Sequence, residues 1–182
     1  LTLYLQDTLG FSPLAAGATF GVLGAGTVLG GLTAARVIAR TSTTTTLVAG
    51  GLLQAVATAV LLLLGTGTGT ALALLLPATF LGGIGNMLVI VGFMITATSG
   101  VPDDEQGLAT GLASMSQQVG ITLGTPVMSA IVTAASGGAI TASAIHHGVT
   151  TAVAVNAALV LLGVVLAANF RRGDRTRTAH HE

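Results

Sequence analysis

Long uncharged apolar stretches, separated by short polar segments, make up most of this chain. The hydrocarbon core of a bilayer is about 30 Å thick, so a membrane-spanning helix needs about 20 mainly apolar residues. Five stretches meet this requirement, and a shorter apolar segment, residues 1–9, precedes them. We expect that segment to be the stub of a helix that begins upstream, which would make the chain a fragment. The pattern predicts an all-α integral membrane bundle with complete helices over residues 13–37, 45–64, 71–98, 103–135 and 148–170.

The segment of residues 107–124 shows most clearly how these helices are expected to pack. At about 100° per residue, five of its bulky side chains form one stripe, and the other positions, apart from Ile121, are small or uncharged and polar. The stripe consists of Leu108, Leu112, Met115, Val119 and Leu123. Small faces with GxxxG spacing favour close helix packing inside a bilayer. We therefore predict packing roles for Gly17, Gly21, Gly30, Gly107, Gly111, Gly120 and Gly124.

Polar residues mark the beginnings of two of the predicted helices. Ser12 is placed to cap the first helix, with Pro13 at its first position. Asp103 is placed to cap the fourth helix, and Gln106 could reach back to it from three residues on. A metal or proton site at residues 103–105 is the less favoured alternative, because these acidic residues are adjacent in sequence and expected to be solvated.

The composition supports a membrane location and excludes several functions. Only 7% of the residues are charged and the mean hydropathy is +0.89, whereas soluble domains carry about 25% charged residues. A net charge of zero excludes a nucleic-acid-binding surface built on basic residues. Cysteine is absent, which excludes disulfides and thiolate metal sites. His146 and His147 are expected in a solvated loop, and no catalytic or metal-binding arrangement stands out. We therefore expect no enzyme, metal or cofactor.

Arginines supply all the positive charges and indicate an orientation. Arg36 and Arg40 follow the first predicted helix, and Arg171 and Arg172 follow the fifth. Both clusters fall on the same side of the membrane, which the positive-inside rule makes cytoplasmic. The sequence thus predicts a multi-pass protein of the cell membrane, with a helical bundle over residues 1–170 and a basic cytoplasmic tail over residues 171–182.

Glycines repeat at a fixed distance along the chain. At an offset of 90 residues, Gly10, Gly17, Gly21 and Gly30 recur as Gly100, Gly107, Gly111 and Gly120. The stub and the first two helices would then correspond to the last three helices. Because each unit has an odd number of helices, the second unit starts from the opposite side of the membrane. This predicts an inverted 3+3 repeat, a pattern found in transporter halves.

Three segments carry a resemblance to a known family. They are residues 4–17 (YLQDTLGFSPLAAG), residues 82–86 (GGIGN) and residues 101–124, which begin Val-Pro and continue through GLATGL and QQVG to Gly124. In them the chain resembles the C-terminal half of a major facilitator superfamily transporter, of the drug:proton antiporter group with fourteen spans. The loop at residues 35–42 (ARVIARTS) keeps the arginines of the family's usual Gly-x-Leu-x-Asp-Arg-x-Gly pattern but lacks its acidic residue and glycines.

This resemblance implies proton-coupled efflux of small amphipathic compounds. Alternating access would move this bundle against an N-terminal half, which carries the family's proton-coupling acids. The expected partners are therefore the lipid bilayer, that missing half and the transported compound. The resemblance also implies that the glycine-rich helices face the central cavity of the transporter.

Uncharged amides are the candidates for a binding role, because no ionisable residue lies in the interior of a predicted span. Asn86, Gln117 and Gln118 lie on glycine-rich helices and are candidate cavity-lining residues, with hydrogen bonding between helices as the alternative. Gln54 and Asn156 are expected to form such interhelical hydrogen bonds.

Two functions compete with that of a half-transporter. One is a non-transporting fragment that inserts into the membrane. The other is a small membrane protein that acts by self-association. The sequence alone leaves both alternatives open.

Overall fold

Five long helices form the protein in the computed structural model, which describes residues 5, 6, 10–63, 68–137 and 142–178. They are α1 (Pro13–Arg40), α2 (Thr43–Val60), α3 (Thr68–Thr98), α4 (Gln106–Ala135) and α5 (Ala142–Thr178), and a 3-10 turn, η2 (Leu61–Leu63), follows α2. All five contain a segment long and apolar enough to cross a membrane. The predicted all-α membrane bundle is therefore confirmed.

Most helix ends differ from the predicted ones by a few residues, and the largest differences are in α3 and α5. α3 begins at Thr68 rather than at residue 71, and α5 begins at Ala142 rather than at residue 148. α5 also continues to Thr178, so most of the segment predicted as a basic tail has helical backbone. Hydropathy locates only the apolar part of such a helix, because hydrogen bonding along the backbone continues where the side chains become polar.

Of the two predicted helix starts, one is confirmed and the other is wrong. The Ser12 hydroxyl accepts a hydrogen bond from the Ala15 N–H at 3.2 Å, and Pro13 is the first residue of α1. α4 begins at Gln106, not at Asp103, and its cap residue Glu105 makes no side-chain capping bond. Gln106 instead donates to the Thr98 and Val101 carbonyls, at 3.1 and 2.7 Å. It thereby satisfies a carbonyl at the end of α3, which would otherwise lack a partner within that helix.

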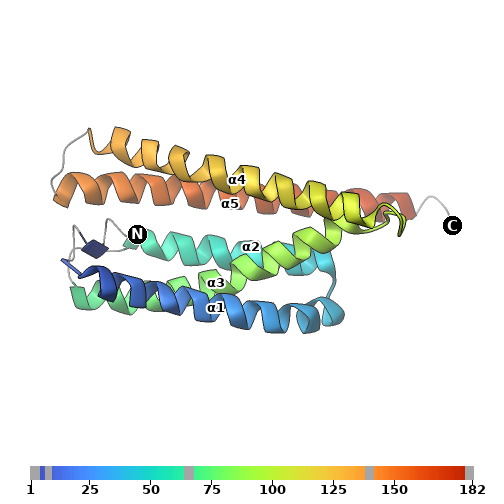
Figure 1. Cartoon of the computed structure of the whole chain (residues 1–182), viewed down its shortest axis with the longest axis horizontal. Coiled ribbons are helices and arrows are strands. Elements are labelled where there is room, and N and C mark those ends of the chain that lie inside the picture. Colours follow the sequence, from blue (N-terminus) through green and yellow to red (C-terminus); the bar gives the residue numbers. More distant parts are fainter. Residues whose placement is uncertain (1–4, 7–9, 64–67, 138–141, 179–182) are drawn as a thin grey trace.

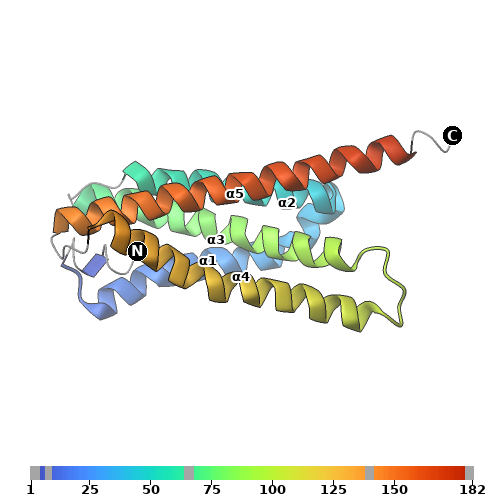
Figure 2. The ribbon, with the colours of Figure 1, turned by 90° about the horizontal axis from the view of Figure 1, so that it is seen from above.

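α3 lies at the centre of the bundle. It packs against α1 on one side and α2 on the other, whereas α4 packs mainly against α5 (Figure 1). In both views α1 and α4 run in opposite directions (Figures 1 and 2). Arg36, Arg40 and the C-terminal end of α5 lie at one end of the bundle, here called the arginine end. The beginning of α1 lies at the opposite end. Leu5 packs there against Ala16, so we call this the Leu5 end.

Two glycines related by the 90-residue offset have the same unusual backbone conformation. Gly10 has a φ of 69° and Gly100 a φ of 77°, in the left-handed region that glycine occupies without steric cost. Each lies in the turn shortly before the long helix of its unit, α1 or α4. The two units therefore share a local turn geometry as well as a glycine spacing.

Glycines allow α1 and α2 to approach α3 backbone to backbone. A Cβ atom on Gly26 of α1 would collide with the Phe80 carbonyl of α3. On the other side of α3, a Cβ on Gly50 would lie 2.9 Å from the Gly85 carbonyl oxygen, and a Cβ on Gly85 2.7 Å from the Gly50 carbonyl oxygen. Such approach maximises van der Waals contact, which is the main source of helix association where lipid is as apolar as the side chains.

Most glycines predicted to pack do not touch another helix of this chain. Among them only Gly30 does, since its Cβ would lie 2.8 Å from the Ile84 carbonyl oxygen. A Cβ on any of the others would have no neighbour within 4 Å in the described structure: Gly17, Gly21, Gly107, Gly111, Gly120 and Gly124. Several glycines that do pack were missed, among them Gly26, Gly50, Gly83 and Gly85, although Gly26, Gly30 and Ala34 show the small-residue spacing of four in the sequence.

We expect Gly26→Ala to destabilise the purified chain in detergent. The added methyl group collides with the Phe80 carbonyl, and overpacking of this kind costs about 1–3 kcal/mol. Gly21→Ala is the matched control, because it is in the same helix and its Cβ would have no neighbour within 4 Å. Thermal unfolding followed by circular dichroism should show a lower Tm for Gly26→Ala and an unchanged or higher Tm for Gly21→Ala. Equal shifts would contradict the close α1–α3 contact.

Candidate functional site

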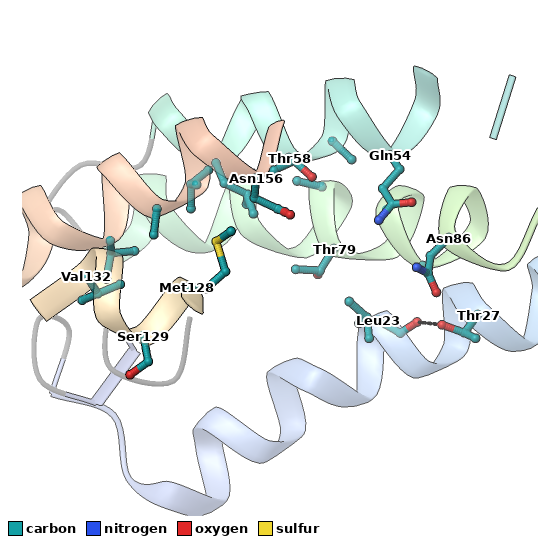
Figure 3. A pocket seen from close by; sticks show the side chains of 18 of the residues that line it. Leu23, Thr27, Gln54, Thr58, Thr79, Asn86, Met128, Ser129, Val132 and Asn156 are labelled. Carbon is teal, nitrogen blue, oxygen red and sulfur yellow. Dashed lines mark hydrogen bonds between the residues drawn. The ribbon is translucent and has the colours of Figure 1, made fainter. Parts of the chain in front are cut away.

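A cavity of about 610 Å³ lies between the helices in the half of the bundle nearer the Leu5 end. All five long helices contribute to its wall (Figure 3). Its polar side chains are all uncharged: Thr27, Gln54, Thr58, Thr79, Asn86, Ser129, Thr133 and Asn156. Leucine, valine, alanine, glycine and Met128 form the rest of the lining. The cavity thus combines an apolar wall with hydrogen-bonding groups at membrane depth.

Three threonine hydroxyls of this cavity bond within their own helices. Thr27 donates to the Leu23 carbonyl at 3.0 Å, as Figure 3 shows, and Thr79 donates to the Leu75 carbonyl at 2.8 Å. Thr133 donates to the Ser129 carbonyl at 3.1 Å. A hydroxyl that bonds four residues back needs no partner on a neighbouring helix. These threonines therefore fit an apolar interior at little cost.

Unlike the three threonine hydroxyls, the three amides of the cavity have no described hydrogen bond within their own helices. Gln54 of α2, Asn86 of α3 and Asn156 of α5 all line the cavity, and Figure 3 shows their side chains extending into it from three helices. No hydrogen bond joins any of these amides to another residue in the described part of the chain. Gln54 and Asn156 were expected to bond between helices, but here they line open space. An amide in an apolar surrounding costs a few kcal/mol without a partner, so this cavity favours an occupant with hydrogen-bonding groups.

A second cavity, of about 520 Å³, continues from the first toward the arginine end. It lies between α2, α3 and α5, and Gln54 lines both cavities. Seven residues of α2 and η2 line the two spaces: Thr44, Leu47, Gly51, Gln54, Ala57 and Thr58 of α2 and Leu61 of η2. We call the two cavities together the α2 trench. α2, α3 and α5 line both cavities, and α1 and α4 complete the wall of the first.

Leu5 lies at the outer end of this trench. Its side chain is 1% exposed and packs with Ala16 and Leu75. Leu61 and Val149, which line the first cavity, also pack against this cluster. The Phe11 N–H donates to the Leu5 carbonyl at 2.9 Å, which ties this segment to the beginning of α1. Leu5 therefore borders the trench.

The predicted candidate residues fall into two places. Asn86 lines the trench, whereas Gln117 and Gln118 lie on α4 away from it. Gln118 borders a shallow depression on the surface of α4, together with Ser114, Met115, Val119, Thr122 and Leu123. The bulky stripe predicted on this helix is exposed, from 55% at Val119 to 67% at Leu108.

Charged residues are confined to the ends of the described helices. Arg36 and Arg40 are exposed at the end of α1, and the Arg36 guanidinium donates to the Leu32 carbonyl at 3.4 Å. The side chains of Arg171 and Arg172 lie outside the described residues. Within the part of the chain that the structure describes, no group of three or more His, Asp or Glu side chains could hold a metal ion.

A known protein is similar in sequence to this chain over almost its whole length. The chain is 36% identical over 179 residues to the puromycin resistance protein pur8 of Streptomyces alboniger, an alignment that covers 92% of the chain and 35% of that protein. The chain thus spans about a third of this relative. No solved structure matches it. The sequence profile of the Major Facilitator Superfamily matches residues 1–182. Together with the membrane-spanning helices, this match shows that the chain belongs to the major facilitator superfamily of membrane transporters.

Proposed function

We propose that this chain forms the C-terminal bundle of an efflux transporter for small amphipathic compounds. It would work by alternating access together with an N-terminal bundle. The name of the relative, a puromycin resistance protein, supports export of a toxic compound. The mixture of apolar wall and uncharged polar groups also suits a compound with both apolar and hydrogen-bonding parts.

The observation that carries this proposal is a pair of unpacked glycine faces at opposite ends of the bundle. Gly17 and Gly21 lie near the beginning of α1 at the Leu5 end, and Gly107 and Gly111 near the beginning of α4 at the arginine end. The 90-residue offset relates the two pairs, and none of the four has a neighbour within 4 Å of a Cβ atom. A second bundle that packs against one pair and then the other would close the two sides of the membrane in turn.

Binding of the transported compound would fall to uncharged groups on the surfaces that this bundle presents to its partner. Gln118 and Met115 border the same depression on α4. The amide offers both a donor and an acceptor, and the flexible thioether adapts to apolar groups of different shape. Asn86 supplies a further amide from the central helix.

Proton coupling would depend on the other bundle. The described membrane spans have ionisable residues only near their ends, at Arg36, Arg40 and His147. Intramembrane acids and histidines are the usual groups of proton relays. We therefore propose that the titrating groups of this transporter lie in the N-terminal bundle.

The orientation in the cell membrane is part of the proposal. Arg36, Arg40 and the C-terminal end of α5 lie together at the arginine end, which the positive-inside rule places in the cytoplasm. Green fluorescent protein fused after Glu182 should fluoresce in a bacterial host, and alkaline phosphatase at the same position should be inactive. The opposite pattern, an active phosphatase and no fluorescence, would reverse the orientation.

Gly111→Leu should abolish export by the full-length protein and leave the bundle folded. A Cβ at this position would have no neighbour within 4 Å in this chain, so we expect the substitution to act mainly on the contact with a second bundle. Ala154→Leu, on the exposed surface of α5, is the control and should export normally. The measurement is puromycin export from cells, together with the amount and thermal stability of the purified protein. Normal export by Gly111→Leu would contradict the proposed contact.

Gln118→Ala tests the binding role of the α4 surface. We expect export to fall about tenfold, which corresponds to about 1.4 kcal/mol, while insertion into the membrane stays normal. Ser116→Ala is a suitable control, because its hydroxyl donates to the Leu112 carbonyl of its own helix. Unchanged export by Gln118→Ala would leave this residue without a binding role.

A transport assay with purified protein separates the competing functions. In proteoliposomes with a pH gradient, the 182-residue chain should move no dye by itself and should do so once an N-terminal half is added. Movement by the chain alone would favour a self-associating protein. If dye movement is absent for the chain alone, for the chain with the N-terminal half and for the full-length protein, the result would favour a non-transporting fragment.

A further inference from the structure

The side chain of Gln106 connects three parts of the chain at the arginine end. Gln106 is the first residue of α4. Its amide nitrogen donates to the carbonyl of Thr98, the last residue of α3, at 3.1 Å, and to the carbonyl of Val101, in the turn between the helices, at 2.7 Å. A side-chain amide nitrogen carries two hydrogens, so both are used. The two bonds join the end of α3, the turn and the beginning of α4.

The backbone of this turn is held less closely to α3. Two backbone hydrogen bonds connect them, from the Ser99 N–H to the Thr96 carbonyl at 3.3 Å and from the Val101 N–H to the Thr98 carbonyl at 3.4 Å. Both are longer than the 2.9–3.0 Å that is usual for such bonds. The bond from Gln106 to the Val101 carbonyl is shorter than either. The side chain therefore strengthens a turn whose own connections to α3 are long.

The remaining length of α4 has its close backbone contact near the Leu5 end. A Cβ atom on Gly148 of α5 would lie 2.6 Å from the Val132 carbonyl oxygen of α4. From there α4 and α5 diverge toward the arginine end, as Figure 2 shows. All residues of α4 are described, and among them Ala113 alone is buried. The direction of α4 at the arginine end therefore depends mainly on its connection to α3.

We propose that Gln106 is a clamp that fixes the direction in which α4 leaves α3, and that it thereby positions the glycine face of α4 for a second bundle. Gly107 and Gly111 follow Gln106 by one and five residues, so a change of angle at Gln106 moves both. The fixed angle is a property of this chain alone, whereas its use in the contact with a second bundle rests on the proposed function. Gln106 is thus a positioning residue.

The clamp requires hydrogen-bond donors, because both partners of the Gln106 amide nitrogen are carbonyl oxygens. Gln106→Glu has nearly the same shape but no N–H group, and its carboxylate would repel both carbonyls. Its negative charge favours the beginning of a helix, so α4 itself should remain intact. Gln106→Arg restores a fork of N–H donors, although a positive charge suits this helix end less well. The two variants therefore separate hydrogen-bond donation from packing and from helix stability.

Distances between spin labels can test the clamp, because the chain has no cysteine and labels can be attached to introduced ones. One pair, Leu32→Cys on α1 and Leu108→Cys on α4, reports on the arginine end, and the native side chains are 65% and 67% exposed. A second pair, Leu14→Cys and Val127→Cys, joins the same helices nearer the Leu5 end at exposed positions. The labelled 182-residue chain is measured in lipid nanodiscs by double electron–electron resonance.

With native Gln106, both pairs should give narrow distance distributions. Gln106→Glu should at least double the width for the arginine-end pair and leave the Leu5-end pair unchanged, and Gln106→Arg should give the narrow distribution again. Thr110→Ala is the matched control, since the Thr110 hydroxyl donates to the Gln106 carbonyl within α4 and its loss leaves the clamp intact.

Three results would overturn the proposal. The first is an unchanged width in Gln106→Glu, and the second is equal broadening by Thr110→Ala. The third is broadening of both label pairs, because the whole bundle would then be loosened. If the charge of Gln106→Glu perturbs the fold, Gln106→Ala replaces it. This variant removes the donors without adding a charge beside the exposed residues 103–105, and it should broaden the arginine-end pair alone.

Export by the full-length protein tests the positioning role of the clamp. Gln106→Ala should lower export several-fold, and Gln106→Arg should restore it, because the direction of α4 sets the position of Gly107 and Gly111. Broadened distances together with normal export would overturn the positioning role. Broadened distances in a protein whose native form exports nothing would refute only the proposed function.

Discussion

Close backbone contact through glycine is the interaction on which this bundle depends. Lipid tails are as apolar as leucine, so burial of bulky side chains gives little net attraction between helices in a membrane. α3 gains its contacts because Gly26 and Gly83 bring it against α1, while Gly50 and Gly85 bring it against α2. α4 has no comparable approach to α3, and it packs mainly on α5. The tight part of the structure is therefore the group of three helices around α3.

Hydroxyls and amides inside the bundle differ in how they find hydrogen-bond partners. Hydroxyls are short enough to bond to the carbonyl four residues back, as Thr27 and Thr79 do, and they make few demands on neighbouring helices. Amides at Gln54, Asn86 and Asn156 reach into open space between helices. Because an unpaired amide is costly at this depth, these three positions favour hydrogen-bonding groups in the space that they line.

Related surfaces in the two repeat units differ in how they pack within the described structure. A Cβ atom on Gly17, Gly21, Gly107 or Gly111 would have no neighbour within 4 Å, and these are the faces that the proposed second bundle would contact. Gly30 is packed against α3, whereas its counterpart Gly120 is not. Equivalent glycines are thus packed in one unit and unpacked in the other.

The sequence by itself determined the membrane location, the five helices and the start of α1 at Ser12 and Pro13, because length, hydropathy and capping are local properties of the chain. It did not determine which glycines pack, since Gly26, Gly50 and Gly85 acquire their role only from the carbonyls that face them on another helix. Part of the trench lining could be predicted from the sequence. Asn86 was identified as a candidate lining residue, whereas Gln54 and Asn156 were assigned to hydrogen bonds between helices. Only the tertiary structure decided that these amides line one trench, because that depends on how α2, α3 and α5 are rotated against each other.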